Sequence, residues 1–142
     1  MSPLVPNSGA DVSGSGRPNR FPRSVRLLRH ADFERVYKQG RRHFAAHMTV
    51  FYLPRREADD ESAHPGPRVG FTVSKVLGGA VVRNRMKRRL REAVRLHGLI
   101  PAAVDVVINP KKSLRAAPFH DLQNEVGRAF EVIEKSAART QR

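Results

Sequence analysis

The chain has 142 residues, and its apolar fraction of 39% is enough for one modest hydrophobic core. Lysine and arginine total 27 against 13 acidic residues, a formal net charge of +14 that favours a polyanionic partner, either nucleic acid or an anionic membrane. The absence of cysteine excludes disulfides, thiolate zinc sites and cysteine nucleophiles.

The ends of the chain differ in composition from its middle. Residues 1–20 are rich in proline, glycine, serine and asparagine, which predicts a disordered tail, and they lack the regions of a signal peptide. No stretch approaches the roughly 20 apolar residues of a membrane span, so we expect a soluble, cytoplasmic protein. One domain is expected over residues 21–135, followed by a polar segment, residues 136–142, that frays.

The first predicted element is a short helix over residues 31–39. At helical spacing, Phe33, Val36 and Tyr37 share one face and should pack against the core. Gly40 is expected to end the helix in a left-handed cap.

Two strands are predicted next. Residues 47–53 and 69–74 are rich in β-forming side chains, and an acidic loop over residues 55–67 separates them. A third strand is possible either within residues 41–46 or near Lys75, and the sequence leaves both alternatives open.

The second half of the domain predicts a helix, a strand and a helix. The first helix covers residues 81–97 and ends at Gly98, the buried strand covers residues 104–108, and the last helix covers residues 118–135. The order helix, two strands, helix, strand, helix indicates an α+β domain.

The helix over residues 81–97 has an unusual charge distribution. Seven lysines and arginines stand against Glu92 as its one acid, and such like charges repel one another. A run of charge is usually a solvated face, but this run has one sign, so we predict guanidinium contacts to phosphates. An apolar stripe should bury the other side of the helix: Val82, Met86, Leu90, Ala93 and Val94.

Two nearly adjacent segments make a more specific pattern. They read Arg68-Val-Gly-Phe-Thr-Val-Ser-Lys75 and, after Gly78, Ala80-Val-Val-Arg-Asn-Arg-Met-Lys-Arg88. Together they resemble the signature of the bacterial ribonuclease P protein family, whose hallmark is Arg-Asn-Arg at the start of a helix. The resemblance extends upstream to Asp32-Phe33 and Val36-Tyr37-Lys38 and downstream to Asp105-Val-Val-Ile108, so it spans about residues 26–135.

The resemblance implies a fold and a function. The fold is a small α/β sandwich of the ribosomal protein S5 domain 2-like type with a left-handed βαβ crossover, where general sheet rules alone predict a right-handed one. The function is that of the protein subunit of ribonuclease P, an endoribonuclease whose catalytic RNA uses Mg²⁺ to remove the 5′ leader of precursor tRNA. The Mg²⁺ would be bound mainly through the RNA, and the protein would supply neither catalytic residues nor metal ligands. No membrane and no obligate protein partner are implied.

The resemblance also assigns two sets of binding residues. Contacts with ribonuclease P RNA, near the metals of the cleavage site, fall to the basic helix, with Arg95 added from its charged side: Arg83, Asn84, Arg85, Lys87, Arg88, Arg91 and Arg95. The leader of precursor tRNA would lie in a cleft between the first helix and the sheet, lined by Phe33, Tyr37, Phe51, Thr72, Ser74 and Lys75. Without the resemblance, the three aromatic residues would be interpreted as core. Val76, Gly79 and Pro110 depart from the family pattern, and Lys111 and Lys112 are candidate substitute cations.

Three other functions are compatible with the charge. A structural ribosomal RNA-binding protein would share charge, size and fold type, but it needs no aromatic leader cleft. A DNA-binding regulator would need a second helix for a helix-turn-helix motif, and none is predicted. A membrane-surface protein would need a wider apolar stripe than the basic helix has.

Overall fold

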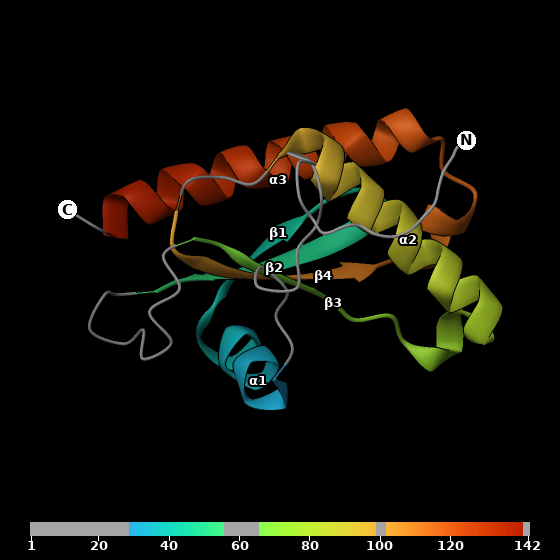
Figure 1. Cartoon of the computed structure of the whole chain (residues 1–142), viewed down its shortest axis with the longest axis horizontal. Helices are drawn as coiled ribbons and strands as arrows, with labels where there is room; N and C mark the ends of the chain where they lie inside the picture. Colours follow the sequence, from blue (N-terminus) through green and yellow to red (C-terminus); the bar gives the residue numbers. More distant parts are fainter. Residues whose placement is uncertain (1–28, 56–65, 99–101, 141–142) are drawn as a thin grey trace, which may run out of the picture.

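A computed structural model describes residues 29–55, 66–98 and 102–140 of the chain. A four-stranded sheet carries α1 on one face and α2 and α3 on the other (Figure 1). In chain order the elements are α1 (His30–Gln39), β1 (Arg41–Phe44), β2 (Met48–Pro54), β3 (Arg68–Phe71), the 3-10 turn η4 (Lys75–Leu77), α2 (Ala80–His97), β4 (Val104–Pro110), the 3-10 turn η5 (Lys112–Arg115) and α3 (Phe119–Thr140).

The strand order in the sheet is β1-β2-β4-β3. β2 pairs antiparallel with β1 and with β4, whereas β3 is parallel to β4 and is joined to it through α2. In this register Phe51 of β2 and Gly70 of β3 lie on either side of Val107 of β4, and all three belong to the face that carries α1.

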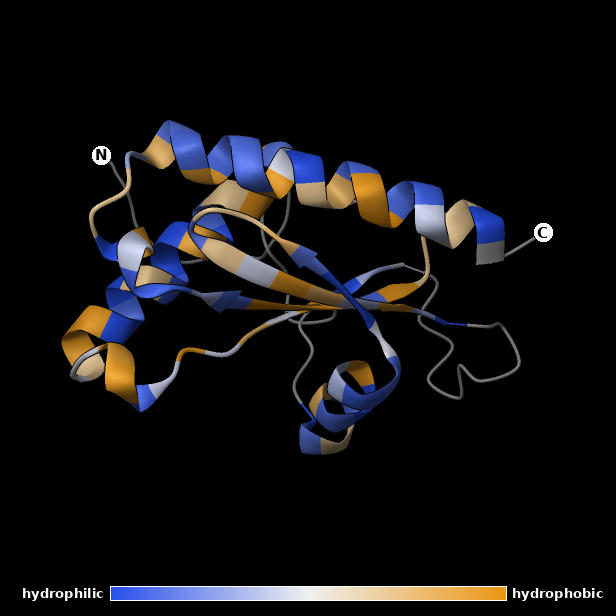
Figure 2. Cartoon of the chain, turned by 180° about the vertical axis from the view of Figure 1, so that it is seen from behind, coloured by the Kyte–Doolittle hydropathy of each residue, from blue (hydrophilic) through white to orange (hydrophobic). Residues whose placement is uncertain are grey.

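The main core lies between the other face of the sheet and the two long helices. The predicted stripe of α2 is confirmed, with Met86, Leu90, Ala93 and Val94 buried and Val82 packed against the core. α3 contributes a stripe of buried apolar side chains at helical spacing: Leu122, Val126, Ala129, Phe130 and Ile133. Figure 2 shows the hydrophilic side of α3 turned away from the sheet and its apolar side turned toward it.

The predicted α+β class and element order are confirmed, and the open question of a third strand is answered. β1 lies within residues 41–46, whereas the chain near Lys75 forms η4. β3 ends at Phe71, earlier than predicted, although the amide N–H of Thr72 still donates to Ile108 O at 3.1 Å. Beyond this bond the chain leaves the sheet, and the Ser74 side chain accepts a hydrogen bond from the Val76 amide at the start of η4.

Two predicted ends of helices were wrong. The segment expected to fray from Ser136 is helical through Thr140, because Ser136 and Ala137 are buried against the core. Gly40 has an extended conformation with φ −80° rather than a left-handed one. A glycine is favoured at this position for another reason, since a Cβ atom there would lie 2.7 Å from Tyr52 O. The predicted tail, residues 1–20, and most of the predicted loop lie outside the described residues.

Candidate RNA interface

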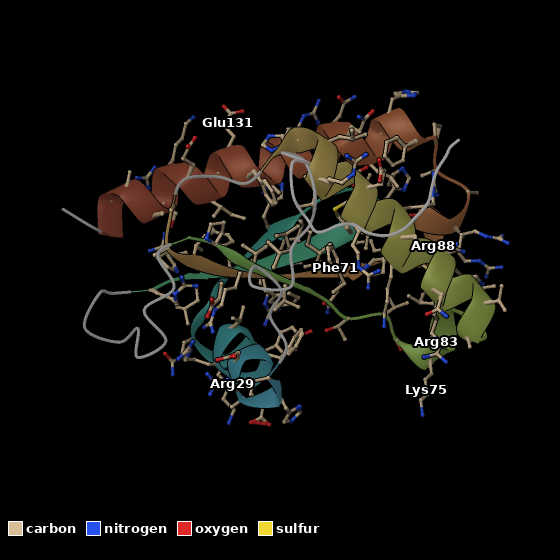
Figure 3. The ribbon with its side chains drawn as sticks, viewed as in Figure 1. Arg29, Phe71, Lys75, Arg83, Arg88 and Glu131 are labelled. Atoms are coloured by element: carbon tan, nitrogen blue, oxygen red, sulfur yellow. The ribbon has the colours of Figure 1, made fainter. Side chains whose placement is uncertain are left out.

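The basic side of α2 is exposed or partly exposed along its length. None of the seven predicted RNA-binding residues is buried: Arg83, Asn84, Arg85, Lys87, Arg88, Arg91 and Arg95. Because the buried stripe fixes the rotation of the helix, Asn84, Arg88 and Arg91 are directed away from the core. In Figure 3, Arg83 and Lys75 lie at the same end of the molecule, and Arg88 lies further along α2.

The cations of α2 are not equivalent. Arg89, which faces η5, donates to Leu114 O at 2.6 Å and also to Ala117 O, so it holds η5 against the helix. Arg95 forms an ion pair with Glu92, and its hydrogen bond lowers the pKa of that carboxyl despite partial burial. Arg95 is therefore partly neutralised, unlike the exposed Arg88 nearer the start of the helix.

The start of α2 is open to an anion. Its N-cap residue is Gly79, so no side chain caps the helix, and the first turn has no acidic residue. Gly78 before it has φ 148°, and Arg83 Nε donates to Gly78 O at 3.1 Å. Unpaired amide groups and the helix dipole make such an end favourable for phosphate.

A hollow of about 390 Å³ lies between α2 and η5. Val82 and Met86 contribute apolar surface to it, and Arg85, Lys112 and Arg115 add positive charge. The sequence reasoning identified Lys112 as a candidate cation but missed Arg115, because no element was predicted over the residues of η5.

The predicted aromatic cleft residues come together between α1 and the sheet. Phe33, Tyr37 and Phe51 are half-buried and pack against Val36 and Val107, which are fully buried. The rings of Tyr37 and Phe51 meet edge to face with centroids 4.9 Å apart.

Two polar side chains border these rings. The Tyr37 hydroxyl donates to Asn109 Oδ1 at 3.1 Å, and the Arg42 guanidinium lies 5.5 Å from the centroid of Phe51. Partly exposed rings with polar neighbours are suited to stacking on unpaired bases. Neither Arg42 nor Asn109 was predicted, because the pairing of strands that brings them here is not encoded locally.

The remaining predicted cleft residues lie on the segment that leaves the sheet. Thr72, Ser74 and Lys75 are all exposed. They follow β3 and lead through η4 into α2, so they connect the sheet, whose one face carries the aromatic cluster, with the basic helix on the other face (Figure 1).

A buried acidic residue fixes α1 on the sheet. Asp105 of β4 is fully buried and accepts two hydrogen bonds from Arg68, both 2.9 Å, one from Arg35 of α1 at 2.9 Å, and another from Arg55. Burial acts to raise the pKa of Asp105, but the hydrogen bonds of Arg68 and the charges of Arg55 and Arg68 outweigh it and hold the pKa below its usual value.

The sequence reasoning did not identify this network. A charged residue inside the apolar run of β4 was the one available signal, and it does not reveal which arginines would surround it.

The described residues contain no group of three or more histidine, cysteine, aspartate or glutamate side chains that could hold a metal ion. None of the described helices has the length and apolar composition that a membrane span requires.

Sequence comparisons identify a family. Residues 21–134 match the family model described as Ribonuclease P. The ribonuclease P protein component of Acidothermus cellulolyticus is 41% identical over 109 residues, which cover 76% of this chain and 87% of the relative. That of Rhodococcus jostii is 37% identical over 107 residues, 75% of this chain and 86% of the relative.

Solved structures give the same result. The fold is similar to the RNase P protein of Staphylococcus aureus, with a TM-score of 0.65 and 26% identity over 78% of this chain and 95% of that one. It is also similar to the RNase P protein of Thermotoga maritima, with a TM-score of 0.62 and 25% identity over 74% of this chain and 94% of that one.

Proposed function

The chain belongs to the ribonuclease P protein family, and from that premise we propose that it binds two RNAs, the catalytic RNA through α2 and the 5′ leader of precursor tRNA through the cleft under α1. As the protein subunit of ribonuclease P it acts in the processing of tRNA 5′ ends. We place this activity in the cytoplasm.

Catalysis is assigned to the RNA in this proposal. The holoenzyme hydrolyses one phosphodiester of precursor tRNA, and the chain contributes binding and charge rather than a general acid or base. The predicted RNA-binding set on α2 supports this assignment, because it consists of six cations and one amide, Asn84. Mg²⁺ would be held mainly by RNA phosphates, and the cations of α2 would adjust the electrostatics around it.

The observation that carries the proposal is the cluster of half-buried aromatic rings between α1 and the sheet. A structural ribosomal protein would share the charge and the fold type. It has no need for half-buried rings beside a segment that carries hydroxyl side chains where the chain leaves the sheet after β3. Phe33, Tyr37 and Phe51 supply those rings, and Thr72 and Ser74 supply the hydroxyls. This combination suits a single strand that passes from the cleft toward the start of α2.

The test is a leader-cleavage assay on precursor tRNA at low Mg²⁺. A bacterial ribonuclease P RNA alone, the protein alone and the two together are compared. Cleavage restored only by the combination is the expected result and places the chemistry on the RNA. A folded protein that gives no enhancement would favour the structural RNA-binding alternative.

A second assay tests the cleft. Phe33→Ala is expected to weaken binding of precursor tRNA, but not of mature tRNA, by about 1–3 kcal/mol, the usual contribution of a stacked base. Val36→Ala serves as the comparison, since Val36 is fully buried in the same helix and its loss acts through stability. Equal losses for precursor and mature tRNA with Phe33→Ala would place Phe33 in the core instead.

A further inference from the structure

Phe44 ends the edge strand β1 with its side chain exposed. Its exposed fraction is 67%, and it is the one aromatic residue among the exposed large hydrophobic side chains of the described residues. An exposed ring on a strand needs an explanation, because β-sheet surfaces with large apolar groups favour association with a partner.

The strand register places Phe44 on the face that carries the aromatic cleft. Phe44 is opposite Thr49, and Arg42 is opposite Phe51, whose ring the Arg42 guanidinium covers at 5.5 Å. Side chains two residues apart on a strand point to the same face, so Phe44 and Arg42 stand side by side at about 7 Å spacing.

α1 leaves this part of the sheet open. The helix packs on β2 and β4, the two central strands, whereas β1 is at the edge of the sheet. The face therefore changes from the partly buried rings of Tyr37 and Phe51 to the exposed side chains of Arg42 and Phe44, which together form a ledge at the edge of the sheet.

We propose that this ledge is a second stacking subsite for single-stranded RNA, in which Phe44 stacks on an unpaired base and Arg42 contacts an adjoining phosphate. This inference rests on the proposed function, and the segment bound at the ledge is the part of the 5′ leader farthest from the cleavage site. An aromatic ring beside a guanidinium is the combination that binds single strands without needing a particular sequence.

The strand order determines the path that the 5′ leader would follow across the sheet. A leader that enters beside Thr72 at β3 crosses β4 and β2 before it reaches β1. Neighbouring strands are about 4.8 Å apart, so the crossing spans roughly 14 Å, and only a leader of several nucleotides reaches Phe44. The ledge would thus make binding depend on leader length.

The experiment uses the holoenzyme assembled from the full chain and a bacterial ribonuclease P RNA. Affinity is measured for mature tRNA and for precursors with leaders of increasing length. Phe44→Ala is expected to weaken binding of long-leader precursors about fivefold or more, as loss of a stacked base does, and to leave short-leader precursors and mature tRNA unchanged. Phe44→Trp should retain the wild-type dependence on length.

Val132→Ala is the matched control, because Val132 is also an exposed apolar side chain but lies on α3. It should match the wild type at every leader length. Sedimentation of the free protein adds a second readout, since loss of self-association in Phe44→Ala would mean that β1 pairs with another copy of the chain and would overturn the proposal.

The outcomes separate this inference from the function on which it rests. If the wild type prefers precursor over mature tRNA but Phe44→Ala matches it at all lengths, the ledge proposal fails and the cleft proposal stands. If the wild type has no such preference, the cleft proposal itself fails. A loss that is equal for every substrate would mean that Phe44 acts through the fold and would also overturn the ledge.

Discussion

Arg88 and Arg89 are neighbours in the sequence with different environments. Arg88 is exposed, whereas Arg89 is half-buried and donates to the backbone of Leu114 and Ala117. Charge counting along the chain treats the two alike. The rotation of α2, fixed by its buried stripe, makes one available to RNA and the other a support for η5.

This difference predicts two distinct phenotypes. Arg88→Ala should weaken binding of ribonuclease P RNA and reduce the slope of log affinity against log salt by about 0.9 for a duplex-like contact or 0.7 for a single strand, with no loss of stability in urea unfolding. Arg89→Ala should lose stability, by about 1.5–3 kcal/mol for its charged hydrogen bonds. Filter binding over a salt series and urea unfolding measure the two effects. An unchanged slope in Arg88→Ala would remove Arg88 from the phosphate contacts.

Asp105 is the buried charge on which three arginines converge. Asp105→Asn leaves Arg35, Arg55 and Arg68 around a neutral amide, so we expect a loss of about 3–5 kcal/mol in the free energy of unfolding at neutral pH. Glu131→Gln on the exposed side of α3 (Figure 3) is the control and should change stability little.

The pH dependence follows from the lowered pKa of Asp105. A carboxyl whose folded pKa lies below its unfolded pKa stabilises the protein fully above the unfolded value, about 3.9, and this contribution is lost as the pH falls through the folded value. The difference in stability between wild type and Asp105→Asn should therefore narrow in acid. Urea unfolding at pH 7 and below pH 4 tests the sign, and a constant difference would contradict it.

At the scale of elements, α1 is positioned by contacts at both of its ends. Asp32 and Arg35 join the network around Asp105, and Gly40 lets the chain turn closely past Tyr52 into β1. These contacts hold the aromatic face of the helix over the sheet, so the packing of Phe33 and Tyr37 depends on residues outside the aromatic cluster.

The turn after α1 supplies a prediction at this scale. Gly40→Ala would place a methyl group against Tyr52 O and should cost about 1–3 kcal/mol, as overpacking does, although the φ of Gly40 suits any residue. Gly79→Ala is the matched control, because a Cβ atom at Gly79 meets nothing within 4 Å. Thermal unfolding compares the two, and equal midpoints would show that the backbone moves aside at Gly40.

How far the sequence predicted the structure also depends on scale. Periodic patterns predicted the three helices and three of the strands, because an apolar stripe is a local property. The edge strand β1 was left undecided, since RRHF has little β-pattern and its pairing with β2 comes from a tight turn. Asp105 and the three arginines around it come from β4, α1, the end of β2 and β3, and only the tertiary fold shows that they meet.

The candidate site was likewise predicted only in part, where local patterns were sufficient. The cations of α2 and the aromatics of α1 follow from spacing and from the family signature. Arg95 was grouped with the binding residues because helical geometry puts it on the charged side, but its ion pair with Glu92 partly neutralises it. Arg42 and Phe44 were missed because their place beside Phe51 depends on strand register.

At the scale of the whole molecule, the net charge of +14 acts in opposite directions on folding and on binding. Like charges in the compact state repel, and added salt screens that repulsion. Salt also competes with the protein for phosphates, because binding releases counterions from the RNA. The same charges therefore oppose folding of the free protein and favour the complex.

Opposite salt dependences of stability and affinity follow from this balance. Raising NaCl within the submolar range should increase the urea midpoint of the free protein while it lowers the affinity for ribonuclease P RNA. The basic face of α2 should account for part of both effects, so Arg88→Ala is expected to flatten both dependences, whereas Lys135→Ala on α3, whose ammonium group pairs with Glu131, should flatten neither. Stability that falls with salt in the free protein would mean that attractive ion pairs, such as those around Asp105, outweigh the repulsion among the surface cations.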